Sequence, residues 1–173
     1  GDAMVTATGL ESGPVYMLSA TIRNEIDRNG ACDLTVDLHP DLALTTVQQR
    51  LAQRRPKESQ ATALRRCLGL SPVAVSLMRE ATGNRLPTDP AALARLVKCL
   101  PLAVHSTAPI ERAISSAGGL ALAELDDHFM VRRLPGTFVA GEMLDWDAPT
   151  GGYLLQASFS TAVAAARGAI VWR

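Results

Sequence analysis

The stretch from Phe138 to Gln156 constrains the fold more than any other part of this chain. It begins with a short apolar run of the kind found in buried strands, and Gly141 and Glu142 follow where the backbone turns. A polar loop then leads to Gly151 and Gly152, after which apolar or small residues recur at helical spacing, at positions 155, 158, 159, 162, 163 and 166. The pattern predicts a strand over 138–140, a loop, and a helix over 153–168.

The paired glycines at the predicted helix start indicate a ligand site. Gly151 and Gly152 let a ligand approach the backbone closely, and the first N–H groups of the helix would face it with the positive end of the helix dipole. Anionic or carbonyl-rich ligand atoms suit such a turn, and an acid beside it, Glu142, suits ligand hydroxyls. The alternative is that the small residues of the helix serve only for close packing against a sheet. Packing alone leaves the acid, the loop and the double glycine unexplained.

Three segments resemble one protein family, in that family's own order. Residues 141–156, with Gly-Glu-x-x-Asp followed by Thr-Gly-Gly-Tyr-x-Leu-Gln, resemble the C-terminal flavin-binding signature of a bacterial family of FAD/NAD(P)-dependent oxidoreductases, related to flavin reductases of bile-acid metabolism. Residues 113–119 resemble its Ala-x-Val-Thr-x-Gly-Gly segment, and residues 6–14 resemble its Thr-His-x-Gly-x-Ser-Gly-Pro segment. The resemblance spans nearly the whole chain. By itself, the Gly-Gly pair at 118–119 would be interpreted as a simple turn.

The resemblance implies a fold. In the intact family, an N-terminal Rossmann segment carries a GxGxxG turn for the FAD pyrophosphate, and a β-rich and helical insertion precedes a return to the FAD domain. This sequence contains no GxGxxG, so we expect the C-terminal part of such a flavoprotein. The expected fold class is α+β: β-strands with a four-helix lobe, followed by a strand–loop–helix segment that completes an FAD-binding Rossmann-type domain. The expected domains are the β-rich part of the insertion (1–42), its helical lobe (43–107) and the flavin-side segment (108–173).

The resemblance also implies which residues bind FAD in the intact protein, with NAD(P)H as the candidate hydride donor. Glu142 and Asp145 would accept hydrogen bonds from ribityl hydroxyls, and residues 151–155 would present N–H groups to the pyrimidine edge of the flavin. The full set is Gly118, Gly119, Gly141, Glu142, Asp145, Gly151, Gly152, Tyr153, Leu154 and Leu155. Leu154 stands where the family usually has asparagine, so only a backbone role is left there. Ala7 stands where histidine is frequent, and the sequence identifies no catalytic acid or base and no substrate.

Composition limits the other functions. The 173 residues include 17 basic and 17 acidic side chains, so a net charge of zero offers no field to gather nucleic acid or an anionic membrane. The cysteines, Cys32, Cys67 and Cys99, are far apart and not in CxxC form. Their number and spacing disfavour a disulfide framework or a zinc site and favour the cytoplasm. No apolar run approaches the roughly 20 residues that cross a bilayer, so no membrane partner is expected.

Local patterns predict the remaining elements. Strands are expected over residues 3–8, 14–20, 32–38, 120–125 and 129–132. The turn from Gly9 to Pro14 is interpreted either as a hairpin connection, which is favoured, or as a loop near the active site. Four short amphipathic helices are expected between about Leu44 and Leu100, because apolar residues recur at helical spacing and caps stand at Ser59, Gly69, Ser71 and Asp89.

The basic residues of the helical region have two interpretations. They could bind a nicotinamide dinucleotide phosphate or a nucleic acid, but they alternate with Gln and Glu, and no aromatic side chain is near to stack on a base. A solvated helix surface is therefore favoured for Arg50, Arg54, Arg55, Lys57, Arg65 and Arg66. A structural role is likewise favoured for His105, which has no histidine or carboxylate at ligand spacing.

Two hypotheses from different classes follow. The first is the C-terminal part of a flavoprotein whose partners are the N-terminal FAD-binding half of the same protein and a small-molecule substrate. The chain alone would then be inactive and would expose Phe138, Val139 and the small face from Leu155 to Ala166, which favours self-association. The rival is a non-enzymatic module whose grooves bind a protein partner, and it would need neither Glu142 nor the glycine pair.

Overall fold

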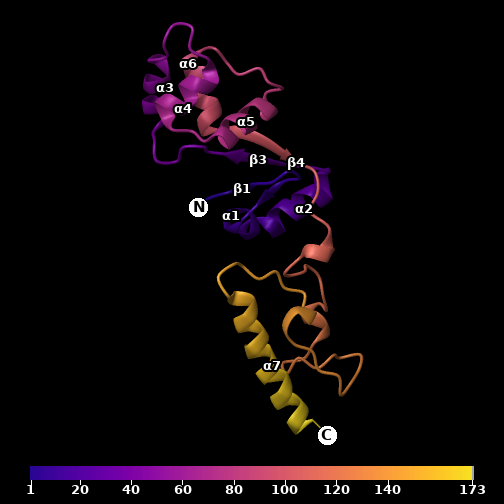
Figure 1. Ribbon diagram of the computed structural model, residues 1–173. Helices are drawn as coiled ribbons and strands as arrows, with labels where there is room; N and C mark the ends of the chain where they lie inside the picture. The colour runs from indigo at the N-terminus through magenta and orange to yellow at the C-terminus, as the bar shows by residue number, and fades with distance from the viewer. Residues whose placement is uncertain (173) are drawn as a thin grey trace. The chain divides into compact units, whose positions relative to one another are not determined.

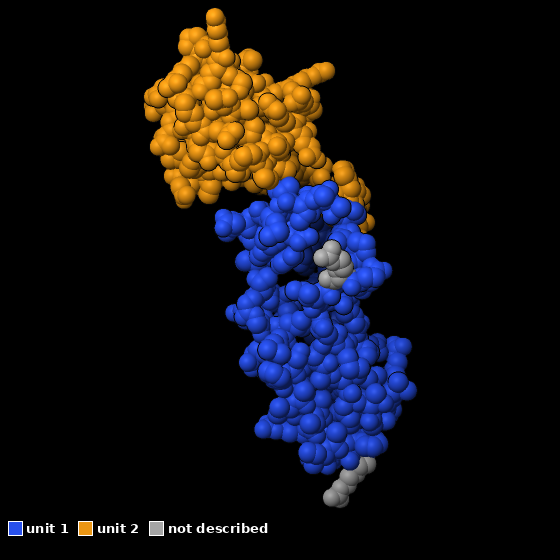
Figure 2. Space-filling model, viewed as in Figure 1, with its two compact units in different colours: residues 1–24, 106–173 blue, residues 25–105 orange. Residues whose placement is uncertain are grey.

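A computed structural model describes residues 1–172, without the side chain of Arg112. The chain divides into two compact units: unit 1 comprises residues 1–24 and 106–173, and unit 2 comprises residues 25–105 (Figure 2). Over the described residues, helices combine with two small two-stranded sheets, which makes the chain α+β (Figure 1). The domain boundaries expected from the sequence stay a prediction.

Unit 1 begins with a short hairpin in place of the long strands predicted there. β1 (Met4–Val5) pairs antiparallel with β2 (Leu10–Glu11). The predicted strand over 14–20 is wrong, because α1 (Gly13–Met17) and the start of α2 (Ser19–Asn29) occupy it. Pro14 explains the helix start: its ring sets a helical φ, and its missing N–H is not needed in the first turn.

Unit 2 starts and ends in one two-stranded sheet. β3 (Cys32–Val36) pairs antiparallel with β4 (Leu100–Val104), so that Cys32 lies opposite Val104. The strand predicted near β3 is confirmed. Pro101 lies inside β4. Proline is tolerated there because each strand of a two-stranded sheet is an edge strand.

Residues 37–99, all of which the structure describes, contain four helices: α3 (Leu44–Ala52), α4 (Gln60–Leu68), α5 (Pro72–Ala81) and α6 (Pro90–Lys98). Three of them begin at a predicted cap. The side chains of Ser59, Ser71 and Asp89 each accept a hydrogen bond from a backbone N–H three residues later. Gly69 ends α4 with φ 68°, in the left-handed conformation of a helix C-cap.

The core of unit 2 lies between these helices and the sheet. Its largest fully buried side chains are apolar: Leu64, Met78, Leu100, Val47 and Val97. Burying a side chain of this size stabilises a fold by about 1.5–3 kcal/mol. At the edge of this core, Lys98 Nζ lies 2.6 Å from Asp37 Oδ2 and donates to the carbonyl oxygens of His39 and Leu42. Lys98 therefore holds the segment between β3 and α3 in place beside the core.

The C-terminal part of unit 1 has more coil than predicted. Single bridges stand where strands were expected at 120–125, 129–132 and 138–140, and they join Leu120 to Leu144, Leu125 to Val131 and Met130 to Phe138. Short 3-10 turns lie at η1 (Ile110–Arg112), η2 (Leu122–Glu124) and η3 (Gly141–Met143). A small core forms from Leu125, Val131, Val139 and Leu144. Val139 was expected to be exposed in this chain alone, and its burial corrects that expectation.

The final helix, α7 (Tyr153–Val171), confirms the predicted helix and extends it. One face packs within unit 1: a Cβ added at Gly168 would lie 2.6 Å from His128 Cβ and 2.9 Å from Phe138 Cε1. A second face carries large exposed apolar side chains, at Leu155, Phe159, Val163 and Ile170. Their spacings of four and seven residues place them on one side of the helix.

This second face changes one expectation from the sequence. The sequence was expected to contain no segment long and apolar enough to cross a membrane, but α7 passes that test by length and composition. Core helices of soluble proteins also meet these length and composition criteria. The finding shows only that α7 is apolar on more of its surface than unit 1 covers.

Candidate functional site

Two of the predicted cofactor segments meet in unit 1 at the parallel bridge between Leu120 and Leu144, a contact that we call the crossing. Leu120 N donates to the carbonyl oxygen of Met143, and Asp145 N donates to the carbonyl oxygen of Leu120, both at 2.9 Å. At this crossing, a Cβ added at Gly119 would lie 2.7 Å from the carbonyl carbon of Leu144. Real Cβ contacts are essentially never that short, so the two backbones meet this closely because residue 119 is glycine.

Glu142 lies beside this crossing. It is the middle residue of η3, its side chain is exposed, and its Oε1 atom accepts a hydrogen bond from the backbone N–H of Ser116 at 3.2 Å. The carboxylate thus faces the small-residue segment that ends in Gly118 and Gly119. One oxygen is engaged by the protein, which leaves acceptor capacity on a carboxylate for ligand hydroxyls.

Gly141 connects the same turn to α7. Its backbone N–H donates to Thr161 Oγ1 at 3.0 Å, and its φ of 65° favours glycine. A Cβ at this position would lie 3.1 Å from Ser158 Oγ, tighter than most real contacts. Ser158 and Thr161 are one turn apart on α7, so Thr161 accepts a hydrogen bond from the turn that carries Glu142 while Ser158 lies close against it.

The start of α7 has the features expected of a backbone ligand site. Gly151 has φ 96° and Gly152 has φ 87°, and a Cβ at either would meet no atom within 4 Å. Gly152 is the N-cap and provides no side-chain cap, and the first α-helical bond runs from Gln156 N to the Gly152 carbonyl. The N–H groups of residues 153–155 therefore have no partner in the preceding turn of the helix, as at any α-helix start. The positive end of the helix dipole adds to their attraction for electronegative ligand atoms.

An ion pair that the sequence did not indicate holds the loop between these features. Arg23 Nη2 on α2 lies 2.5 Å from Asp147 Oδ2, and both side chains are partly exposed. No local pattern identifies Arg23, because its partner is far away in the sequence. Asp145, two residues before Asp147, keeps its carboxylate exposed while its backbone N–H is used at the crossing.

The carboxylate of unit 1 with a clearly lowered pKa lies outside this group. Asp126 accepts hydrogen bonds from the backbone N–H of Met130 and of His128, both at 2.9 Å. The bond from Met130 is the main cause of the lowered pKa, and burial opposes it. The Asp126 carboxylate therefore orders the loop between Asp126 and Met130.

The predicted site residues fall into two groups. The first, joined by the hydrogen bonds of the crossing and of η3, contains Gly118, Gly119, Gly141, Glu142 and Asp145. The second, at the start of α7, contains Gly151, Gly152, Tyr153, Leu154 and Leu155. The later turns of α7 contact η3, which links the groups through Ser158 and Thr161. Cofactor roles for both groups stay predictions.

Comparison with known proteins places the chain in context. Residues 3–168 match the family described as the HI0933-like protein Rossmann domain. The chain is also 26% identical over 179 aligned residues to the 3-dehydro-bile acid delta(4,6)-reductase of Clostridium scindens. That alignment covers 98% of this chain but 44% of the reductase, so the chain spans less than half the length of this relative.

Proposed function

Because the chain belongs to the HI0933-like Rossmann-domain family of FAD-binding flavoproteins, we propose that it is the flavin-side part of an FAD-dependent oxidoreductase. The observation that carries this proposal is the close crossing at Gly119, with the Glu142 carboxylate beside it. When FAD is bound, it supplies hydride transfer between NAD(P)H and an organic substrate. The substrate is a small molecule of unassigned class, and the proposed compartment is the cytoplasm.

The chain's own residues would bind and orient the cofactor. Glu142 and Asp145 are exposed carboxylates that would accept hydrogen bonds from ribityl hydroxyls. The N–H groups of residues 153–155 would face the pyrimidine edge of the flavin, where the helix dipole favours negative charge. The open space above Gly151 and Gly152 supports this fit, because a side chain at either position would stand where the ligand approaches.

The proposed partner is the N-terminal FAD-binding part of the same protein. The exposed apolar face of α7, with Leu155, Phe159 and Val163, supports this partner, because Rossmann helices pack such a face against a parallel sheet. In that arrangement residues 1–107 would form an insertion with a four-helix lobe, and residues 108–173 would complete the Rossmann-type domain. The relative's name, a reductase, supports reduction as the reaction class.

Flavin content of the intact protein tests the proposal. We expect yellow protein after desalting, with FAD released on denaturation and bleaching on addition of NADH or NADPH without oxygen. Glu142→Gln should weaken FAD binding by about 1–3 kcal/mol if a hydrogen bond to the cofactor is lost. Asp127→Asn, at another exposed acid of the same unit, is the matched control. Colourless protein that takes up no added FAD would contradict the proposal.

A further inference from the structure

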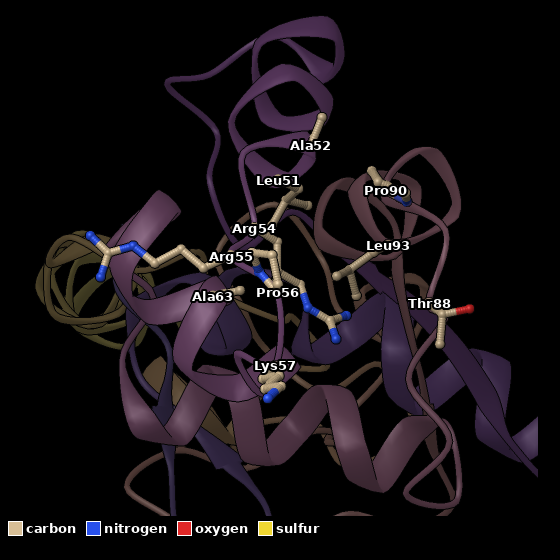
Figure 3. Close-up of a pocket in the computed structure, with 10 residues that line it drawn as sticks. All are labelled: Leu51, Ala52, Arg54, Arg55, Pro56, Lys57, Ala63, Thr88, Pro90 and Leu93. Atoms are coloured by element: carbon tan, nitrogen blue, oxygen red, sulfur yellow. The ribbon is translucent and has the colours of Figure 1, made fainter.

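Unit 2 contains a cavity that the flavin proposal leaves unexplained. It has a volume of about 340 Å³ and lies where the loop after α3 meets the starts of α4 and α6 (Figure 3). Leu51 and Leu93, both nearly fully buried, close its floor. This volume lies within the range of small-molecule sites, about 300–1,000 Å³, and exceeds the needs of a bare inorganic ion.

Three cations line this cavity, and none of its lining residues is acidic. Arg54, Arg55 and Lys57 lie in the loop between α3 and α4, so the helix surface predicted for them is wrong, although they are exposed as expected. Glu58, the acid next to them, is already engaged. Its Oε1 lies 2.7 Å from Nε of Arg66, and its Oε2 accepts the Arg55 backbone N–H at 3.0 Å.

The structure defines the geometry of two of these cations, Arg54 and Lys57. Arg54 Nε donates to the carbonyl oxygen of Glu58 at 3.0 Å, which orients the guanidinium. Figure 3 shows the Arg54 side chain turned toward Leu93 and Thr88, whereas Arg55 extends in the opposite direction. Lys57 has φ 67°, a left-handed conformation that is costly for a residue with a side chain. Such strain is retained where the surrounding structure requires that geometry, commonly at binding sites.

The cations favour a ligand with an anionic group, and the uncharged lining residues indicate the chemistry of the rest of the ligand. Ala52, Pro56 and Pro90 supply aliphatic surface, and no lining residue is aromatic, so the cavity offers no stacking platform for a nucleotide base. We propose that unit 2 binds an aliphatic carboxylate, with the carboxylate held by Arg54 and Lys57 and the hydrocarbon part against these walls. The site lies wholly within unit 2 and does not depend on the flavin proposal.

Calorimetric titration of the chain with octanoate tests this site. We expect saturable binding that weakens as salt is raised, since the attraction between exposed charges is screened. Lys57→Gln should raise the dissociation constant about fivefold, and the double variant Arg54→Gln/Lys57→Gln should raise it more than about tenfold. Ala52→Phe should abolish binding by filling the cavity from the exposed end of α3.

Two controls distinguish loss of the binding site from a general loss of positive charge and from a loss of folding. Arg50→Gln removes the same charge from α3 but does not line the cavity, and it should leave octanoate affinity unchanged. Circular dichroism checks that each variant keeps its helices. The proposal is overturned if octanoate does not bind, or if Lys57→Gln and Ala52→Phe bind it like the parent. Tighter binding of inorganic phosphate or NADP⁺ than of octanoate would also overturn it and assign the site to phosphate.

Discussion

Arg23 Nη2 on α2 and Asp147 Oδ2 in the loop before Gly151 lie 2.5 Å apart, although 124 positions separate them in the sequence. The contact joins the beginning of unit 1 to the loop that precedes α7. Ion pairs with this degree of exposure contribute at most about 1 kcal/mol to folding. The main effect of the pair is therefore to fix the position of the loop before Gly151, and its contribution to folding stability is small.

Breaking this pair should affect cofactor binding more than folding. In the intact protein, Arg23→Gln should weaken FAD binding severalfold, up to about 1 kcal/mol, because the loop before Gly151 loses its tether. Arg133→Gln is the matched control, since Arg133 Nε pairs with Glu124 Oε2 at 3.0 Å elsewhere in unit 1. Equal FAD affinity in the two variants would show that the tether has no such role.

The crossing at Gly119 should tolerate no side chain. Gly119→Ala places a Cβ within 2.8 Å of backbone atoms of residues 143–145. We expect destabilisation of about 1–3 kcal/mol from overpacking, in addition to backbone strain. Gly118→Ala isolates the strain, because its φ is 88° but no atom lies within 4 Å.

Tryptophan fluorescence during urea unfolding measures this difference. The chain has 2 tryptophans, Trp146 and Trp172, and both belong to unit 1. The signal therefore reports the unit that contains the crossing. If Gly119→Ala and Gly118→Ala unfold at the same urea concentration, the close crossing is not a stability determinant.

Two substitutions at Gly152 should separate the effect of its backbone conformation on FAD binding from the effect of a side chain that blocks the ligand. Gly152→Asn keeps a residue that tolerates φ 87°, whereas Gly152→Val adds a branched side chain where the structure leaves open space. In the intact protein we expect both to weaken FAD binding, and Val far more than Asn. Flavin absorbance after desalting is the measurement. Wild-type retention of FAD in the Val variant would remove the argument for a close ligand approach.

Unit 2 should lose stability in acid through Glu58. The hydrogen bond from Arg66 is the main cause that lowers the pKa of Glu58 from 4.5 to about 2. A lowered folded-state pKa contributes stability that is complete above the unfolded value and is lost as pH falls through the folded value. The difference in unfolding free energy between wild type and Glu58→Gln should therefore shrink as pH falls from about 4.5 to about 2.

Acid titrations followed by circular dichroism, with urea at each pH, provide this comparison. Arg66→Gln should remove most of the same pH-dependent component, because its guanidinium is the principal partner of Glu58. A difference between wild type and Glu58→Gln that stays constant over this pH range would contradict the role given to the pair.

The chain alone should bind FAD weakly or not at all. Each hydrogen bond from the α7 start and Glu142 is worth on the order of 1 kcal/mol net, against an association cost of at least about 4 kcal/mol. The exposed face of α7 should instead promote self-association. Calorimetry with FAD and sedimentation would decide: micromolar binding by a compact monomer would show that the chain is a complete cofactor domain.

Elements with local signals were predictable from the sequence. Three of the four helices between residues 44 and 98, α4, α5 and α6, begin or end at Ser59, Gly69, Ser71 and Asp89, whose capping preferences act within one turn. The glycines at 151 and 152 likewise adopt the positive φ that their type favours. The α7 start was predictable because both its glycine pair and its apolar spacing are local.

The predictions that failed did so for two reasons. The strand expected over 14–20 is helical because the helix-start preference of Pro14, a local signal, outweighs the strand preference of Val15 and Tyr16. The other features depend on distant partners. The strands expected after residue 119 reduce to single bridges, since a strand needs neighbours to complete its ladder. The ion pair between Arg23 and Asp147 and the cavity beside Arg54 form only when segments that are separate in the sequence come together.

The pairing of β3 with β4 has a consequence for how such proteins can vary. Because Cys32 lies opposite Val104, the chain enters and leaves the helical unit at adjacent points. Segments whose two ends are neighbours can be lengthened, shortened or exchanged with little effect on the flanking sequence. Evolution could therefore remodel residues 37–99 as a cassette, altering what unit 2 recognises while the turns around Gly119 and Gly152 are inherited unchanged.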